Sequence, residues 1–146
     1  MIEKTLTIIK RDGIENAENM FDRILIDGYK ILIIKKMQWT LQEAQAFYAV
    51  HKGSGFFKNL TEFMSSGTII AAILEKENAI EDYRKLMGAT NPAKAADGTF
   101  RKLYGDPERY AKGEATNAVH GSDSPESADW EIKFIFPGFA LLMTDE

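Results

Sequence analysis

Residues 5–39, TLTIIKRDGIENAENMFDRILIDGYKILIIKKMQW, contain the pattern that decides the fold. The β-branched, apolar run at 5–9 is typical of a central strand, and the turn signal Asp12-Gly13 follows it. Apolar residues then recur every three or four positions, which predicts an amphipathic helix that stops at Asp27-Gly28. A second apolar strand is expected over 31–39. The segment therefore predicts a strand, a helix and a second strand in succession.

The remaining chain extends this unit with further helices and strands. Thr40 is expected to cap a short helix, with Glu43 in capping-box position, and a second helix follows over 56–64. A strand over 68–74 and a helix between Asn78 and Gly88 come next, followed by a loop-rich span over 89–116. The last expected elements are a helix that starts at Pro125 behind an N-cap at Ser124 and a strand over 133–136. Residues 137–146 receive no assignment.

Four strands separated by helices predict an α+β fold. We expect a ferredoxin-like βαββαβ core, in which a four-stranded antiparallel sheet is covered by helices, with extra helices and a long loop. A flavodoxin-like parallel sheet is the alternative, but the irregular stretch before the last strand lacks the further strand–helix unit it would need. The chain has 146 residues and shows no repeat or linker, so one domain over 1–146 is expected.

Composition narrows the classes of function. The chain has no cysteine, which excludes a thiol nucleophile, a disulfide framework and a cysteine-based metal site. Its net charge of −4 argues against dedicated nucleic-acid binding. The apolar runs TIIAAIL and FIFPGFALLM are too short to span a bilayer, and the first residues do not match a signal peptide. We therefore expect a cytoplasmic protein without a membrane partner.

The segment 115–132, ATNAVHGSDSPESADWEI, contains one of the two histidines in the chain, His120. We expect it on a polar loop that opens onto the positive end of the helix starting at Pro125, where anions bind. A neutral imidazole in such a place can attack a phosphoryl group. The alternative is a solvated surface histidine. Asn117, Ser122 and Glu131, which lie close by in sequence, favour the first interpretation.

Common nucleotide-binding motifs are absent, because the chain contains neither GxxxxGK[ST] nor GxGxxG. A nucleotide would therefore have to be held by side chains. Each available side chain, taken alone, is better explained as a solvated surface charge or a turn residue than as a nucleotide contact. The candidates at loops and element ends are Lys10, Arg84, Thr90, Asn91, Arg101 and Asn117.

Together these residues match a family. The string NAVHGSDSPESA closely resembles the active-site segment of the nucleoside diphosphate kinases, and TLTIIKRDG, FYAVHKGSGFF, SGTIIAAILEKENAI and YRKLMGATNPAKAADGTFR resemble other segments of that family. The resemblance covers almost the whole chain. It implies a phosphate-accepting His120, supporting Tyr48, Ser122 and Glu131, a base-stacking Phe56, a sugar-contacting Asn117, and phosphate-binding Lys10, Arg84, Thr90 and Arg101.

The resemblance also implies an activity. A kinase of this family would move the γ-phosphoryl group of a nucleoside triphosphate to His120 and then to a nucleoside diphosphate, by a ping-pong route. Base tolerance should be broad, because every base has a face on which Phe56 can stack. Mg²⁺ would arrive with the nucleotide phosphates, with no metal site made by the protein alone. A homo-oligomer is implied as well.

Two other functions remain open at this point. A non-catalytic nucleotide-binding regulatory protein of the same fold is the first. An RNA-binding module on the same scaffold is the second. Such modules display aromatic residues on the sheet, whereas TLTIIK and ILIIKKM carry none, and the net charge has the wrong sign.

Several positions depart from the family pattern. Arg11 replaces a proline, Ser54-Gly55 replace Arg-Pro, Phe100 replaces a smaller aliphatic residue, and Thr116 replaces an arginine. The segment 102–116, here called the insertion, is several residues longer than its family counterpart. It could cover the nucleotide cleft, alter subunit packing or form an inert surface loop. None of these departures removes a candidate site residue.

Overall fold

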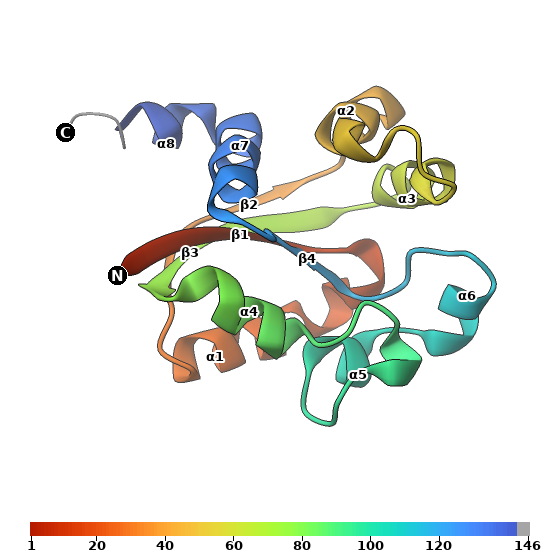
Figure 1. Cartoon of the computed structure of the whole chain (residues 1–146), viewed down its shortest axis with the longest axis horizontal. Coiled ribbons are helices and arrows are strands. Elements are labelled where there is room, and N and C mark those ends of the chain that lie inside the picture. Colours follow the sequence, from red (N-terminus) through yellow and green to blue (C-terminus); the bar gives the residue numbers. More distant parts are fainter. Residues whose placement is uncertain (143–146) are drawn as a thin grey trace.

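The computed structural model describes residues 1–142 and contains a four-stranded antiparallel sheet (Figure 1). The strands are β1 (Ile2–Ile9), β2 (Lys30–Met37), β3 (Ile69–Glu77) and β4 (Val119–Gly121), in the order β2-β3-β1-β4. Every pairing is antiparallel, which confirms the ferredoxin-like α+β fold and excludes the flavodoxin-like alternative.

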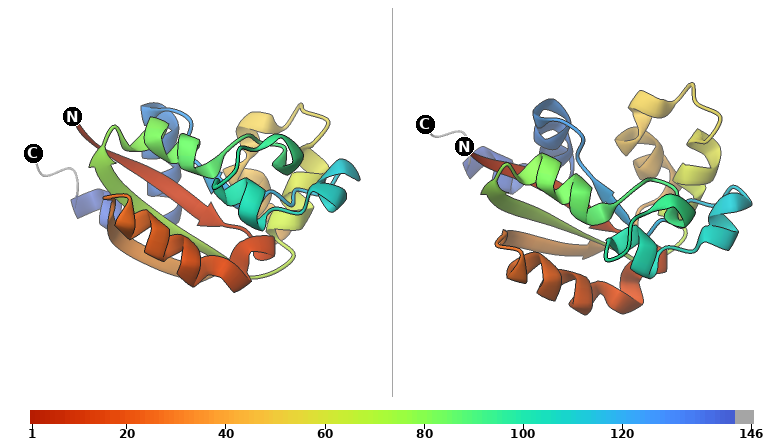
Figure 2. Two further views of the ribbon diagram at one scale, coloured as in Figure 1. Left: turned by 90° about the horizontal axis from the view of Figure 1, so that it is seen from below. Right: turned by 60° about the horizontal axis from the view of Figure 1, so that its bottom comes forward.

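Helices cover both faces of this sheet. They are α1 (Ala17–Ile26), α2 (Leu41–Phe47), α3 (Phe57–Met64), α4 (Ala79–Met87), α5 (Phe100–Tyr104), α6 (Pro107–Ala111), α7 (Pro125–Ile135) and α8 (Pro137–Leu142), with 3-10 turns η1 (Arg11–Asn16), η2 (Ala49–His51) and η3 (Pro92–Lys94). Figure 1 shows α7, α2 and α3 on one side of the sheet and α1, α4 and α5 on the other. Figure 2 shows α1 and α4 on this face, with strands of the sheet visible between them.

Strand β3 shows why the sequence folds into these layers. Its residues alternate between the two faces, as successive side chains of a strand must. Ile69, Ala71 and Ile73 are buried in the core beneath α2, α3 and α7. The residues between them, Ile70, Ala72 and Leu74, are buried in the core beneath α1 and α4. A strand covered on both faces has to be apolar throughout, which explains the uninterrupted apolar run in the sequence.

The expected last strand over residues 133–136 is wrong. That stretch lies at the end of α7, whose buried residues Ala128, Ile132 and Ile135 recur at helical spacing. The fourth strand is instead the three-residue β4, which pairs with β1 and places His120 opposite Ile8. The loop expected around His120 is therefore wrong too. A strand this short has no periodicity of its own and forms because β1 offers it a backbone partner.

Other expected element boundaries are confirmed. The hydroxyl of Thr40 accepts from the Glu43 N–H and the Glu43 carboxylate accepts from the Thr40 N–H, which completes the capping box of α2. Ser124 caps α7 through the Ser127 N–H. Helix α8 forms where no element was assigned. The end of the expected domain and of the unassigned tail, residues 143–146, lies outside the described residues.

The helices within residues 1–142 are all too short or too polar to cross a bilayer.

Candidate active site

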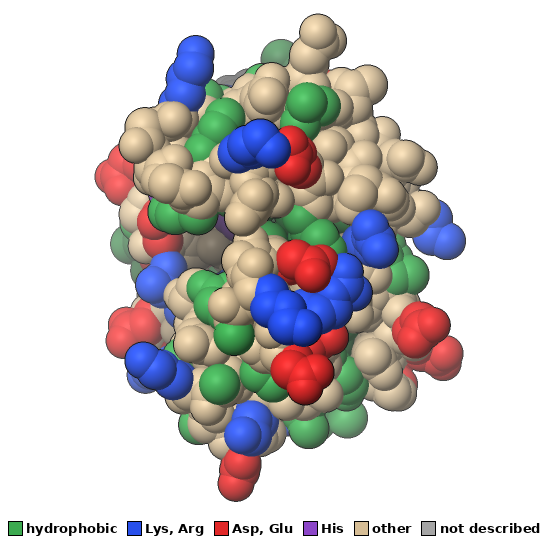
Figure 3. All heavy atoms as spheres, turned by 90° about the vertical axis from the view of Figure 1, so that its right-hand side faces the viewer, with side chains coloured by type: hydrophobic (Ala, Val, Ile, Leu, Met, Phe, Trp, Pro, Cys, Tyr) green, Lys and Arg blue, Asp and Glu red, His purple; other side chains and the backbone are tan. Residues whose placement is uncertain are grey.

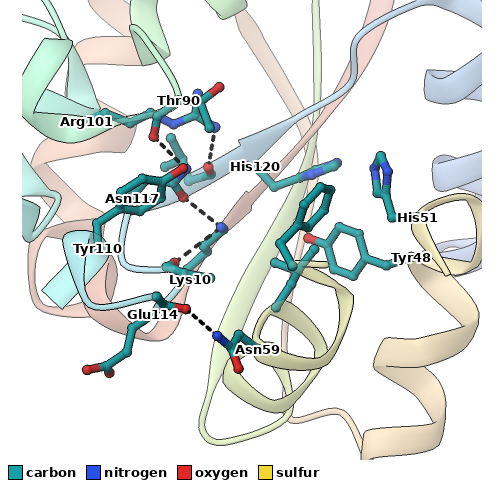
Figure 4. A pocket seen from close by; sticks show the side chains of 15 residues that line it. Lys10, Tyr48, His51, Asn59, Thr90, Arg101, Tyr110, Glu114, Asn117 and His120 are labelled. Carbon is teal, nitrogen blue, oxygen red and sulfur yellow. Dashed lines mark hydrogen bonds between the residues drawn. The ribbon is translucent and has the colours of Figure 1, made fainter. Parts of the chain in front are cut away.

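A cavity of about 440 Å³ opens beside β4, between the α2–α3 hairpin and the loops around α5 and α6. Figure 3 shows the hollow on the surface with a histidine in its depth, and Figure 4 shows the lining side chains converging on it. Seven residues proposed from the sequence line this cavity: Lys10, Tyr48, Phe56, Thr90, Arg101, Asn117 and His120. Arg84 lines an adjoining hollow that shares Thr90, Arg101 and His120.

The His120 ring is held from behind by α7. Its Nε2 lies 3.1 Å from Oε1 of Glu131, and the Ser122 hydroxyl donates to that same oxygen at 2.7 Å. Ser122 in turn accepts from the Leu6 N–H of β1. A neutral imidazole that donates from Nε2 to a carboxylate has an unprotonated, nucleophilic Nδ1. The two side chains are 17% and 12% exposed, so this pair is largely shielded from water.

Aromatic rings fix the other side of the histidine. Phe47, at the end of α2, lies edge-on to the His120 ring with 5.4 Å between centroids. Tyr48 makes a similar contact at 5.8 Å, and its buried hydroxyl has no hydrogen-bond partner among the described residues. A buried hydroxyl without a partner is costly, so Tyr48 keeps a donor available beside the histidine.

Lys10 follows β1 and carries a buried ammonium group. Its Nζ donates to Oδ1 of Asn117 at 2.7 Å, and Nδ2 of Asn117 donates to the Thr90 carbonyl at 2.9 Å. Burial lowers the pKa of Lys10 to about 7, with a further lowering from Arg101 and an opposing effect of Asp12. A lysine poised in this way becomes fully charged when an anion enters the site.

Arg101 lies on α5 and is oriented by backbone carbonyls. Nη1 donates to the Gly88 carbonyl at 3.1 Å and Nη2 to the Val119 carbonyl at 2.9 Å. Burial lowers the pKa of Arg101, and its Nε has no partner among the described residues. The guanidinium therefore retains N–H groups that can bind phosphate oxygens.

Phe56 stands at the start of α3 and remains 53% exposed. Its ring packs against His51, with 5.2 Å between the ring centroids. A half-exposed aromatic ring on a cavity wall provides a face on which a nucleobase can stack.

Sequence reasoning missed several side chains of the cavity wall, among them His51, Asn59, Leu60, Tyr110 and Glu114. Leu60 follows Phe56 by four residues, so helical spacing places the two on one face. His51 lies in the quoted string FYAVHKGSGFF but received no role. Asn59 and Tyr110 had no signal, because their position at the cavity depends on how α3 and the insertion fold together.

A metal site formed by the protein alone finds no support in residues 1–142. They contain no group of three or more His, Cys, Asp or Glu side chains that could hold a metal ion. Cationic and neutral donors predominate in the cavity lining, and the acidic Glu114 among the lining residues is paired with Arg109, so the lining suits an anion.

Comparisons with known proteins agree with this geometry. The family model described as nucleoside diphosphate kinase matches residues 3–141. The nucleoside diphosphate kinase of Flavobacterium psychrophilum is 49% identical over 137 residues, covering 92% of this chain and 94% of that protein. That of Chlorobaculum parvum is 48% identical over 146 residues, covering 99% of this chain and 100% of that protein.

Solved structures show the same likeness. The Aquifex aeolicus nucleoside diphosphate kinase superposes with a TM-score of 0.87 at 39% identity, covering 96% of this chain and 99% of its own. An NDP kinase from Pyrobaculum aerophilum gives 0.81 at 28% identity, with 93% and 96% covered. The chain belongs to the nucleoside diphosphate kinase family.

Proposed function

We propose that His120 accepts the γ-phosphoryl group of a nucleoside triphosphate and passes it to a nucleoside diphosphate. The Nδ1 lone pair forms the N–P bond while the bond from the γ-phosphorus to the β–γ bridging oxygen breaks, and the diphosphate leaves. A second diphosphate attacks the same phosphorus and restores free His120. The observation that carries this proposal is the hydrogen bond between Nε2 and Glu131, which leaves Nδ1 as the nucleophile.

The other residues receive roles from chemistry and position. Arg84 and Arg101 supply planar forks for phosphate oxygens, while Lys10 and Thr90 add a point charge and a hydroxyl. Asn117 would contact the sugar and Phe56 would stack on the base. Tyr48 lies against the His120 ring, and Ser122 and Glu131 hold that ring. Developing charge on the phosphoryl group is then met by donors already in place.

Magnesium enters this scheme as part of the substrate. Mg²⁺ keeps several waters and binds phosphate oxygens in sites of this kind, so it needs no dedicated protein cage. The basic lining of the cavity fits a nucleotide that brings its own cation. The side chains then contact the phosphate oxygens that Mg²⁺ leaves free.

Arg11 and the insertion are the two departures from the family pattern that would support the non-catalytic alternative, and neither occupies the cavity. Nη1 of Arg11 donates to Oγ of Ser66 at 2.9 Å, and the guanidinium stacks on Phe63 at 5.7 Å. Both partners belong to the segment around α3, and Arg11 is not among the residues that line the cavity. The insertion lines the cavity rather than filling it. No observation therefore favours a regulatory protein over a kinase.

Assembly and location are part of the proposal. We propose a homo-oligomer, because large apolar side chains such as Ile26 and Ile34 remain exposed on α1 and on the edge strand β2. We propose the cytoplasm as its location, where nucleoside di- and triphosphates are abundant.

The decisive experiment is intact mass after the protein is mixed with ATP and Mg²⁺ and freed of nucleotide. We expect the gain of one acid-labile phosphoryl group, its absence in His120→Ala, and its discharge by added GDP. As a control, calorimetry should show that His120→Ala still binds ADP. Wild-type protein that binds ATP without gaining mass would refute the phosphohistidine route.

A further inference from the structure

The insertion over 102–116 is a folded element whose two ends are joined by hydrogen bonds. The N–H of Asp106 donates to the Thr116 carbonyl at 2.8 Å, and the Thr116 hydroxyl donates to the Asp106 carbonyl at 2.9 Å. Asp106 also caps α6, and Arg109 forms an ion pair with Glu114 within the loop. A loop whose ends are hydrogen-bonded to each other and which contains an internal ion pair holds a defined shape.

This element forms one wall of the cavity. Tyr110, Gly113 and Ala115 line it from the insertion, while Phe56, Asn59 and Leu60 line it from the segment of α3. Figure 4 shows Asn59 facing the insertion at one end of the cavity, with His120 away from that contact. The space between the two walls is where the base would lie if Phe56 stacks on it.

A hydrogen bond joins the two walls directly. Nδ2 of Asn59 donates to the Gly113 carbonyl at 2.8 Å. Gly113 has a φ of +98°, which side chains disfavour, and a Cβ at this position would lie 3.1 Å from Nδ2 of Asn59. Glycine therefore serves both the backbone conformation that aims the carbonyl and the close approach of the amide. We call this contact the clasp.

We propose that Asn59 is a positioning residue for the nucleobase, acting through Gly113 to hold the insertion at a set distance from Phe56. This inference rests on the proposed function, because it requires the nucleotide to bind with its base at this end of the cavity. If the two cavity walls are already held at the distance that a nucleobase needs, the protein loses less conformational entropy when the nucleobase binds between them. The phosphate-binding groups Lys10 and Arg101 are held mainly from outside the insertion, by Asn117 and by the Gly88 and Val119 carbonyls. Lys10 reaches the insertion through a long, 3.4 Å hydrogen bond to the Ala115 carbonyl, beside the end that Thr116 closes. The clasp therefore acts mainly on the nucleobase.

The test compares a substrate with a base and one without. Quench-flow measures phosphorylation of His120 as a function of ATP concentration and, separately, of ribose 5-triphosphate concentration. For Asn59→Ala we expect the concentration of ATP that gives half-maximal rate to rise about three- to tenfold, the loss of one hydrogen bond, with the maximal rate unchanged. With ribose 5-triphosphate the variant should match wild type.

Two further variants separate the hydrogen bond from the shape of the side chain. Asn59→Asp keeps the shape of the side chain but places a hydrogen-bond acceptor against the Gly113 carbonyl. It should therefore weaken ATP binding at least as much as Asn59→Ala does. Gly113→Ala should do the same, whereas Gly28→Ala is its matched control. Gly28 has a similar φ of +96° with open space around its Cβ position, so that variant carries comparable backbone strain without touching the cavity.

The outcomes distinguish this proposal from the proposed function. The proposed role of Asn59 would be refuted if Asn59→Ala bound ATP and ribose 5-triphosphate more weakly by the same factor. It would also be refuted if both Asn59 variants behaved like wild type. If wild type were not phosphorylated at all, the phosphohistidine route would fail. Calorimetry of ADP binding would still test the clasp, because Asn59→Ala must then bind ADP about three- to tenfold more weakly than wild type.

Discussion

Lys10 shows how burial tunes a single residue for anion binding. Its ammonium group lies in the wall of the cavity, where desolvation lowers its pKa to about 7. In the empty site at pH 8, most Lys10 is therefore uncharged. A bound polyphosphate favours the charged form, so binding must draw a proton from solvent.

The resulting prediction concerns protons. At pH 8 we expect ADP binding to take up about one proton, and affinity to fall as pH rises from about 7 to 9, because the protonated lysine becomes scarcer. Calorimetry in two buffers of different ionisation enthalpy measures the uptake. Lys10→Met should bind ADP more weakly and take up no proton on binding. Equal heats in both buffers for the wild-type protein would contradict the prediction.

The site residues that could be predicted from sequence are those that a local motif marks. His120, Ser122 and Glu131 lie within one short segment, and the structure joins them in one hydrogen-bonded set. Asn59 and Tyr110 could not be predicted, because each becomes a cavity residue only when distant segments meet. Their roles depend on tertiary contacts, which leave no trace in spacing along the chain.

Strand β4 depends on an anchor at its start. Ala118 has a φ of +72°, an uncommon conformation for a residue with a Cβ. Its N–H donates to Oδ2 of Asp12 at 3.0 Å, and its carbonyl accepts from the Lys10 N–H at 2.8 Å. The sequence marked Asp12 only as part of a turn. The structure shows that its carboxylate also holds the backbone two residues before His120.

Removing this anchor should affect both stability and rate. For Asp12→Ala we expect a loss of about 1–3 kcal/mol in the free energy of unfolding, because the Ala118 N–H is left without a partner. The phosphorylation rate of His120 should fall as well, because β4 is less firmly placed. Chemical denaturation and quench-flow measure the two effects. Asp12→Asn keeps an acceptor oxygen and should recover most of both; failure to recover would point to the charge instead.

The helices and strands that could be predicted are those with a long apolar pattern or with recognisable capping residues. The apolar run of β1, the capping box of α2 and the Ser124 cap of α7 are local signals, and the structure confirms all three. The end of α7 was mistaken for a strand because its last residues are a dense apolar run, which looks alike in a strand and in a buried helix. Three-residue β4 has no local signal, since its pairing with β1 forms it.

At the scale of the whole molecule, exposed apolar surface suggests self-association. β2 is an edge strand, and Figure 2 places α1 beside it in both views. Ile26 is 79% exposed and Ile34 is 51% exposed on these two elements. Apolar side chains at an open sheet edge favour pairing with another copy.

Sedimentation velocity tests this expectation. The wild-type protein should sediment as an oligomer, and Ile34→Glu should weaken association about tenfold or more, because a buried carboxylate would lack a partner. Leu103→Glu, at an exposed position on α5, should leave association unchanged. A wild-type monomer at all concentrations would refute the proposed oligomer, and an unaffected Ile34→Glu would place the interface elsewhere.

By itself, the sequence determined the fold class, the family resemblance and the candidate residues of the site, because apolar periodicity, helix caps and a dense local motif are local properties of the chain. Only the tertiary structure decided that His120 lies on a strand, that Asp12 anchors that strand, and that the insertion forms a wall of the cavity against α3. These features arise from hydrogen bonds between segments as far apart as Asp12 and Ala118 or Asn59 and Gly113, and no local pattern encodes such pairings.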